Sequence, residues 1–192
     1  PHTGCHPKLK LGNGAFPNAR IYRQEEIGFA LNKILMAEWA QKKNISLMGH
    51  SEGGWAVAQS RYAEFAGVII SGATCTNRVN PAYDGIYVPP NIPLLAMASI
   101  DDEWYVNKPS IKGNCADKAM NRNFFRQIDI PGSVHPTFGS SIARDAVKNF
   151  LIDHFLDLKN LSAEDPLLID PYQVSRFHFL ELNETDLKSI VL

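Results

Sequence analysis

The stretch Leu47–Trp55, LMGHSEGGW, carries a serine with a glycine two residues before it and another two residues after it. The mostly apolar run 44–48 comes just before that serine, and a run of this length ending in glycine predicts a buried strand. Residues 52–65 contain no proline, and no glycine after Gly54, which predicts a helix. Glycines leave room where a strand turns sharply into a helix. The stretch therefore predicts that Ser51 lies on a tight strand-to-helix turn.

Strands and helices alternate on both sides of this turn. Apolar residues at helical spacing predict helices at 24–43 and 143–158. Short apolar runs predict strands at 68–71, 94–98 and 124–130. Alternation of this kind is typical of an α/β fold, so we expect a three-layer αβα sandwich with a mostly parallel sheet.

The composition indicates one soluble domain with a sizeable core. The chain has 192 residues, of which 45% are hydrophobic and 20% charged, and its formal net charge is -1. This balance gives no electrostatic reason for a nucleic-acid partner or an anionic membrane. Every apolar run is shorter than the ~20 residues that a membrane span needs. We therefore expect a small-molecule partner, no nucleic acid and no membrane span.

Proline and glycine divide the chain into three parts. Residues 1–20 are rich in both and are expected to form a leading loop. Residues 21–158 are expected to form the α/β core. Residues 159–192, interrupted by Pro166 and Pro171, are a C-terminal extension to which no function is assigned.

The cysteines do not indicate a disulfide scaffold or a zinc site. Cys5, Cys75 and Cys115 are few and widely spaced. Cys75 and Cys115 are the first pair to test for a disulfide, and buried free thiols are the alternative.

A serine nucleophile needs a histidine base, and that histidine needs a carboxylate to orient it. Among the six histidines, His135 follows the strand 124–130 directly, where a loop brings an imidazole over the sheet edge. Asp101 and Asp102 follow the strand 94–98, at the same edge as Ser51. Either aspartate fits a triad in the order Ser, Asp, His. The backbone N–H of Glu52 is expected to donate to an oxyanion.

Each of these residues has a structural alternative. The alternative for Ser51 is an idle serine in a Gly-rich turn, for His135 a solvated loop histidine, and for the aspartates an acidic surface turn. The segment 76–91 fits a cap over an apolar pocket and a plain surface loop equally well. Trp104, beside the aspartates, either lines the pocket or packs in the core, and the sequence favours the core.

The motifs resemble the α/β-hydrolase superfamily, and within it the dienelactone hydrolase-like serine hydrolases. The resemblance covers about residues 23–156 and rests on LMGHSEGG, PLLAMASIDDEW and GSVHPTF. In that family the acid follows the proline that opens its strand by about nine residues. Counted from Pro93, the resemblance selects Asp102 over Asp101.

Two features depart from that family. Dienelactone hydrolases proper have a cysteine where this chain has Ser51, so their lactone specificity is not carried over. The family also has early strands, with a loop that supplies a second oxyanion N–H, and residues 1–20 do not resemble them. We therefore expect an α/β-hydrolase fold that is incomplete at its N-terminus.

The predicted function is a serine hydrolase of the carboxylesterase type. The triad Ser51, Asp102 and His135 would cleave a small-molecule ester or lactone through an acyl-enzyme, and the chemistry requires no cofactor or metal. The alternatives are a non-catalytic hydrolase-like module that binds a ligand or partner, and an acyltransferase that uses the same triad.

Overall fold

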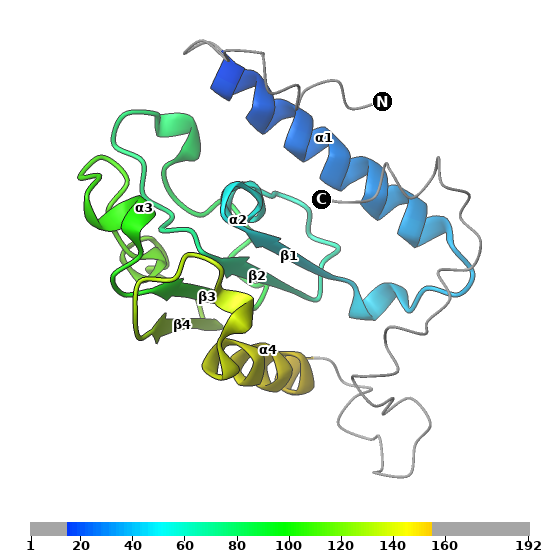
Figure 1. Ribbon diagram of the computed structural model, residues 1–192. Coiled ribbons are helices and arrows are strands. Elements are labelled where there is room, and N and C mark those ends of the chain that lie inside the picture. Colours follow the sequence, from blue (N-terminus) through cyan, green and yellow to red (C-terminus); the bar gives the residue numbers. More distant parts are fainter. Residues whose placement is uncertain (1–14, 155–192) are drawn as a thin grey trace.

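Parallel strands lie at the centre of the computed structural model, which describes residues 15–154 (Figure 1). The α-helices are α1 (Ala15–Met36), α2 (Glu52–Ala58), α3 (Glu103–Val106) and α4 (Ser141–His154). The strands are β1 (Ser46–His50), β2 (Gly67–Ser71), β3 (Leu94–Ser99) and β4 (Phe125–Ile130). Short 3-10 helices are η1 (Lys42–Asn44), η2 (Pro81–Tyr83), η3 (Cys115–Lys118) and η4 (Thr137–Gly139).

The sheet of the described residues is parallel throughout. Its strands pair in the order β1-β2-β3-β4. The central strand β2 is buried along its whole length, because helices cover both faces of a parallel sheet and leave no polar side. β1 lies at one edge, where Met48 is 47% exposed.

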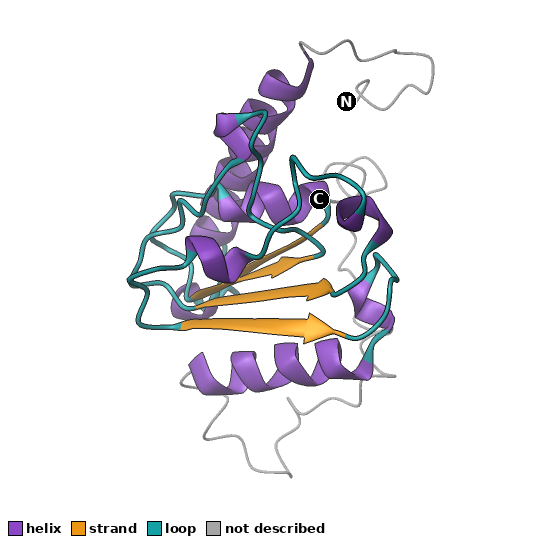
Figure 2. Ribbon diagram, turned by 90° about the vertical axis from the view of Figure 1, so that its left-hand side faces the viewer, coloured by secondary structure: helices purple, strands orange, loops and turns teal. Residues whose placement is uncertain are grey.

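Successive residues of the central strands point into two separate cores. Val68 and Ile70 belong to the core beneath α1 and α2, together with Ile27 and Leu31 of α1. Ile69 belongs to the core that α4 covers. Figure 2 shows α4 along one face of the sheet and α1 and α2 along the other. The predicted three-layer α/β fold with a parallel sheet is therefore confirmed.

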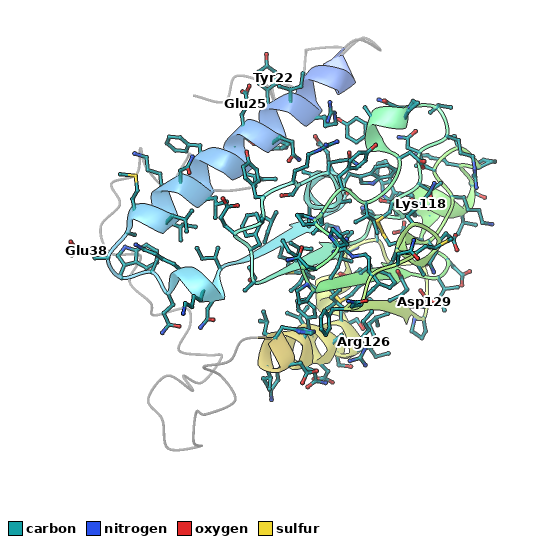
Figure 3. All side chains as sticks on the ribbon, turned by 180° about the vertical axis from the view of Figure 1, so that it is seen from behind. Tyr22, Glu25, Glu38, Lys118, Arg126 and Asp129 are labelled. Carbon is teal, nitrogen blue, oxygen red and sulfur yellow. A yellow bond between two sulfur atoms is a disulfide. The ribbon has the colours of Figure 1, made fainter. Side chains whose placement is uncertain are left out.

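The first helix differs from its prediction at both ends. It begins at Ala15, so the predicted loop is wrong for residues 15–20. Pro17 lies in its first turn, where a missing N–H leaves no helical hydrogen bond unmade. Tyr22 and Glu25 project from the outer side of α1 (Figure 3). The helix ends at Met36, which is 80% exposed, because packing on the core no longer supports it there.

The second helix is shorter than its prediction for a tertiary reason. It was expected to reach Phe65 and ends at Ala58. The carbonyl of Ala58 accepts a hydrogen bond from the N–H of Tyr87 (2.7 Å), a residue far away in sequence. The last carbonyls of a helix have no partner within it, and Tyr87 supplies one for Ala58. The other expected strands lie within two residues of their predicted bounds, whereas residues 1–14 and 155–192 lie outside the described part.

Cys75 and Cys115 form a disulfide, with their Cα atoms 4.8 Å apart. It connects the loop after β2 to the start of η3 across 40 residues of chain. Both cysteines are buried. The alternative of two free thiols is therefore wrong for this structure.

Replacing both Cys75 and Cys115 with alanine is expected to lower the free energy of unfolding by about 2–4 kcal/mol, because the unfolded chain loses a cross-link. Urea unfolding followed by circular dichroism measures this change. Dithiothreitol should destabilise the wild-type protein to the same extent and leave the double variant unchanged. Equal stability of the wild-type protein with and without reductant would contradict the expectation.

Candidate active site

Ser51 lies at the turn between the end of β1 and the start of α2. Its backbone has φ 56° and ψ -116°, a region that costs a non-glycine residue on the order of 1–3 kcal/mol. The N–H of Ser51 donates to the carbonyl of Ser71 at the end of β2 (2.9 Å), and its carbonyl accepts from Trp55 (3.1 Å). Neighbouring elements therefore hold the strained turn from both sides.

The glycines around the turn do not contribute equally. A Cβ at Gly49 would lie 2.2 Å from the carbonyl oxygen of Gly53, so only glycine fits there. A Cβ at Gly53 would meet nothing within 4 Å, which corrects the expectation that this glycine makes room. Gly54 takes that role instead, since a Cβ there would lie 2.8 Å from the carbonyl oxygen of Ser71. One glycine on each side of Ser51 is therefore required for steric reasons. These are Gly49, two residues before the serine, and Gly54, three residues after it.

The loop after β4 brings His135 over the carboxyl edge of the sheet. Its Nε2 lies 2.8 Å from Oγ of Ser51, and its Nδ1 lies 2.6 Å from Oδ2 of Asp102. The hydroxyl of Ser99, at the end of β3, donates to the carbonyl of Val134 (2.5 Å) and anchors the loop beside the histidine. His135 is thus within hydrogen-bond reach of both Ser51 and Asp102.

Asp102, and not Asp101, is the carboxylate that faces His135. The Asp102 side chain is 1% exposed, and its Oδ1 accepts from the backbone N–H of Trp104 at the start of α3 (3.0 Å). One carboxylate oxygen is therefore fixed by the helix and the other by the imidazole. Asp101 is exposed, and its backbone N–H donates to Gly132 (3.1 Å).

Two aromatic residues of α3 lie beside His135. The Tyr105 ring centroid is 5.7 Å from that of His135, and the Tyr105 hydroxyl donates to the carbonyl of Gly72 (2.5 Å). Burial raises the pKa of Tyr105 to about 12; a hydrogen bond with Trp55 opposes this rise and the Asp102 charge adds to it. The phenol therefore stays protonated at neutral pH and acts as a donor.

The prediction that Trp104 packs in the core is wrong. It is 53% exposed, and its ring centroid lies 5.8 Å from that of His135. The ammonium of Lys108 lies 4.5 Å from the same ring. Trp104 therefore forms part of the open surface next to the histidine.

A cavity of about 270 Å³ opens beside Ser51. Its walls come from α1, β1 and α2, and its apolar residues are Ile27, Leu47, Met48, Ala56 and Val57. Glu52 and Gly53, at the start of α2, line it as well. The Glu52 side chain is 54% exposed and lies 3.8 Å from Nε of Arg23. Ser51 and Glu52 thus both line a mostly apolar space.

No residue of the segment 76–91 lines this cavity. Tyr83 and Val88 are buried in the core beneath α2, and Tyr83 contacts Trp55 with ring centroids 5.9 Å apart. The guanidinium of Arg122 donates to the carbonyls of Val88 and Pro89. The segment is therefore a surface loop anchored to the core by the buried side chains of Tyr83 and Val88, while Val79 and Tyr87 are exposed.

Sequence reasoning missed two polar residues at this edge, Ser71 and Thr137. Both are 1% exposed, and their hydroxyl oxygens lie 2.5 Å apart. The Ser71 hydroxyl also lies 3.0 Å from Nδ1 of His50. A serine at the carboxyl end of a fully apolar strand is the signal that would have drawn attention to Ser71.

Two further properties concern residues 15–154 alone. Within this range, no three His, Cys, Asp or Glu side chains gather as a metal site would require. None of the helices in the same range has the length and apolar character of a bilayer span.

No family model matches the chain, and no curated protein matches it. Among solved structures it is similar to SOBER1 F65L from Arabidopsis thaliana, with a TM-score of 0.47 and 13% sequence identity. The match covers 71% of this chain and 65% of that chain, so it spans less than two thirds of the SOBER1 structure.

Proposed function

We propose that this protein is a serine hydrolase of the α/β-hydrolase type, with Ser51, His135 and Asp102 as its catalytic triad. The observation that carries the proposal is the continuous hydrogen-bonded series from Asp102 through His135 to Ser51, with distances of 2.6 and 2.8 Å. A non-catalytic module would have no need to bring these side chains within hydrogen-bond reach. The strained backbone of Ser51 adds to this support, because such strain clusters at functional sites.

The first step follows from the orientation of the imidazole. Asp102 accepts the Nδ1–H of His135, which leaves Nε2 free to take the proton of the Ser51 hydroxyl. Oγ then attacks the ester carbonyl, and the carbonyl oxygen becomes an oxyanion. The N–H of Glu52 donates to that oxyanion.

The second half of the cycle uses the same groups. His135 gives its proton to the leaving alcohol, and the acyl group stays on Ser51 as an ester. His135 then takes a proton from water, which attacks the acyl-enzyme and releases the carboxylic acid. The reaction needs no group beyond these side chains, one backbone N–H and water.

The cavity beside Ser51 supports a small-molecule ester or lactone with an apolar acyl group. Its walls are mostly apolar, and the ion pair of Arg23 with Glu52 neutralises its charged rim. A carboxylesterase-type activity fits these walls. The resemblance to dienelactone hydrolase-like enzymes is part of this proposal.

A fluorophosphonate probe is expected to label the folded protein at Ser51, because only a serine with a paired histidine reacts with such a probe at neutral pH. Mass spectrometry of the digested protein identifies the labelled peptide. Heat-denatured protein is the matched control and should remain unlabelled. Absence of labelling in protein shown to be folded by circular dichroism would overturn the proposal.

A further inference from the structure

His50 lies directly before Ser51 and takes part in a partly buried polar network that the proposed mechanism does not use. Its Nδ1 lies 3.0 Å from the hydroxyl of Ser71, which in turn lies 2.5 Å from the hydroxyl of Thr137. Ser71 comes from the end of β2 and Thr137 from the start of η4. Three segments far apart in sequence are therefore joined side chain to side chain.

The network connects both ends of the nucleophile–base pair. The carbonyl of Ser71 accepts from the N–H of Ser51 (2.9 Å), so Ser71 holds the nucleophile turn through its backbone. Thr137 follows His135 by two residues, so the hydroxyl of Ser71 also holds the loop that carries the base. This link is independent of the hydrogen bond between Ser51 and His135.

Packing places the His50 ring directly beside the base. Its centroid lies 4.9 Å from that of His135 and 5.9 Å from that of Phe138. Gly72 makes room for the ring, because a Cβ there would lie 2.5 Å from Cε1 of His50. A charge on His50 would therefore act at short range on His135.

We propose that His50 is a positioning residue, which as a neutral imidazole holds the His135 loop in register with Ser51 through Ser71 and Thr137. The inference rests on the function proposed above. In this role His50 does not contact the substrate and does not transfer a proton. Its role is to keep Nε2 of His135 within reach of the Ser51 hydroxyl, since small displacements of a base lower a reaction rate strongly.

The charges around His50 agree with a neutral ring. Burial lowers the pKa of His50, the neighbouring His135 lowers it further, and Asp102 opposes the change. On the cavity side, Arg23 and Glu52 are paired with each other at 3.8 Å. When His135 takes the proton of Ser51 it becomes a cation, and a neutral His50 beside it adds no repulsion.

The hydrogen-bond role is tested by comparing two replacements of His50. His50→Asn places an amide close to the position of Nδ1 and keeps a bond to Ser71, whereas His50→Leu keeps bulk and removes the bond. We expect kcat to fall about 10-fold in His50→Leu with KM little changed, and to recover most of this loss in His50→Asn. Equal kcat in His50→Leu and wild type, or equal loss in both variants, would overturn the proposal.

Thr137→Val removes the far end of the network without changing side-chain shape. Its expected effect is also about a 10-fold loss of kcat. Thr74→Val is the matched control, because Thr74 is also buried and its hydroxyl donates to the carbonyl of Ile111 (2.6 Å), away from His135. A Thr137→Val enzyme with the same kcat as Thr74→Val would overturn the proposal.

Titration gives a readout that a purely structural role would not change. Because the pKa of His50 in the folded protein is below its ordinary value of 6.5, the unfolded chain binds more protons as the pH falls below 6.5. His50 therefore makes the folded state less stable on acidification, and His50→Asn should flatten the fall of unfolding free energy below that pH. In wild-type enzyme the acid limb of log kcat should steepen where His50 protonates, and in His50→Asn it should not.

Nuclear magnetic resonance of the imidazole nitrogens separates this inference from the proposed function. We expect a neutral His50 ring at pH 7 and altered His135 ring signals in Thr137→Val but not in Thr74→Val. These spectra test the network even if the fluorophosphonate leaves wild-type protein unlabelled, a result that would contradict the hydrolase alone. Unchanged His135 signals in Thr137→Val would overturn the positioning role.

Discussion

Ser51→Ala is expected to lower the rate of ester hydrolysis on the order of 10⁴- to 10⁶-fold. The substitution removes the only atom that attacks the carbonyl, and His135 cannot replace it efficiently with water. The remaining rate comes from substrate binding and the Glu52 N–H. Hydrolysis of a p-nitrophenyl ester, followed by absorbance, measures the change.

Ser60→Ala is the matched control for Ser51→Ala. Ser60 follows α2 and is 1% exposed, and its hydroxyl has no hydrogen-bond partner among the described residues. Removing this hydroxyl should leave the hydrolysis rate within about twofold of the wild-type rate, since no interaction is lost. A Ser51→Ala protein that retains more than about a tenth of the wild-type rate would show that another residue attacks the substrate.

Asp102→Asn is expected to lower kcat by about 10⁴-fold with little loss of structure. An asparagine keeps the size of the side chain, and its carbonyl oxygen still accepts from Trp104. Its amide N–H would then face Nδ1 of His135, which stabilises the tautomer with the proton on Nε2. That tautomer cannot take the proton of Ser51. Steady-state kinetics measures the loss, and thermal unfolding checks that the fold is kept.

Asp101→Asn is the neighbouring control. Asp101 is exposed, and its side chain makes no contact with His135 in the structure. The substitution removes the same charge one residue earlier in the chain and is expected to change kcat by less than about threefold. If the two variants lost activity equally, the effect would come from the local charge and not from the bond to His135.

Most of the secondary structure follows from local sequence. The strands 67–71 and 94–99 are apolar up to a final serine, and that pattern is enough to predict buried parallel strands. The end of α2 does not follow from it. Tyr62 and Phe65 fit a helix well, but the helix ends at Ala58, whose carbonyl accepts from the distant Tyr87. Helix propensity alone does not reveal that Tyr87 is the partner of this carbonyl.

The residues of the candidate site were likewise predicted only in part from the local sequence. The sequence predicted Ser51 and His135 from their places after strands, because side chains at the carboxyl ends of parallel strands share one edge. It left Asp101 and Asp102 open on physical grounds, since both follow β3 within three residues. The fold separates them, because the start of α3 buries Asp102 and leaves Asp101 in water.

Periodicity and glycine placement by themselves determined the α/β class, the strand-to-helix turn at Ser51 and the edge at which its partners gather. These depend on residues close together in the chain. Only the tertiary structure decided the disulfide, the contact of Asp102 with His135 on physical grounds, the exposure of Trp104 and the network through His50 and Ser71. Each of these depends on how segments far apart in sequence are placed, and that geometry exists only once the sheet brings those segments together.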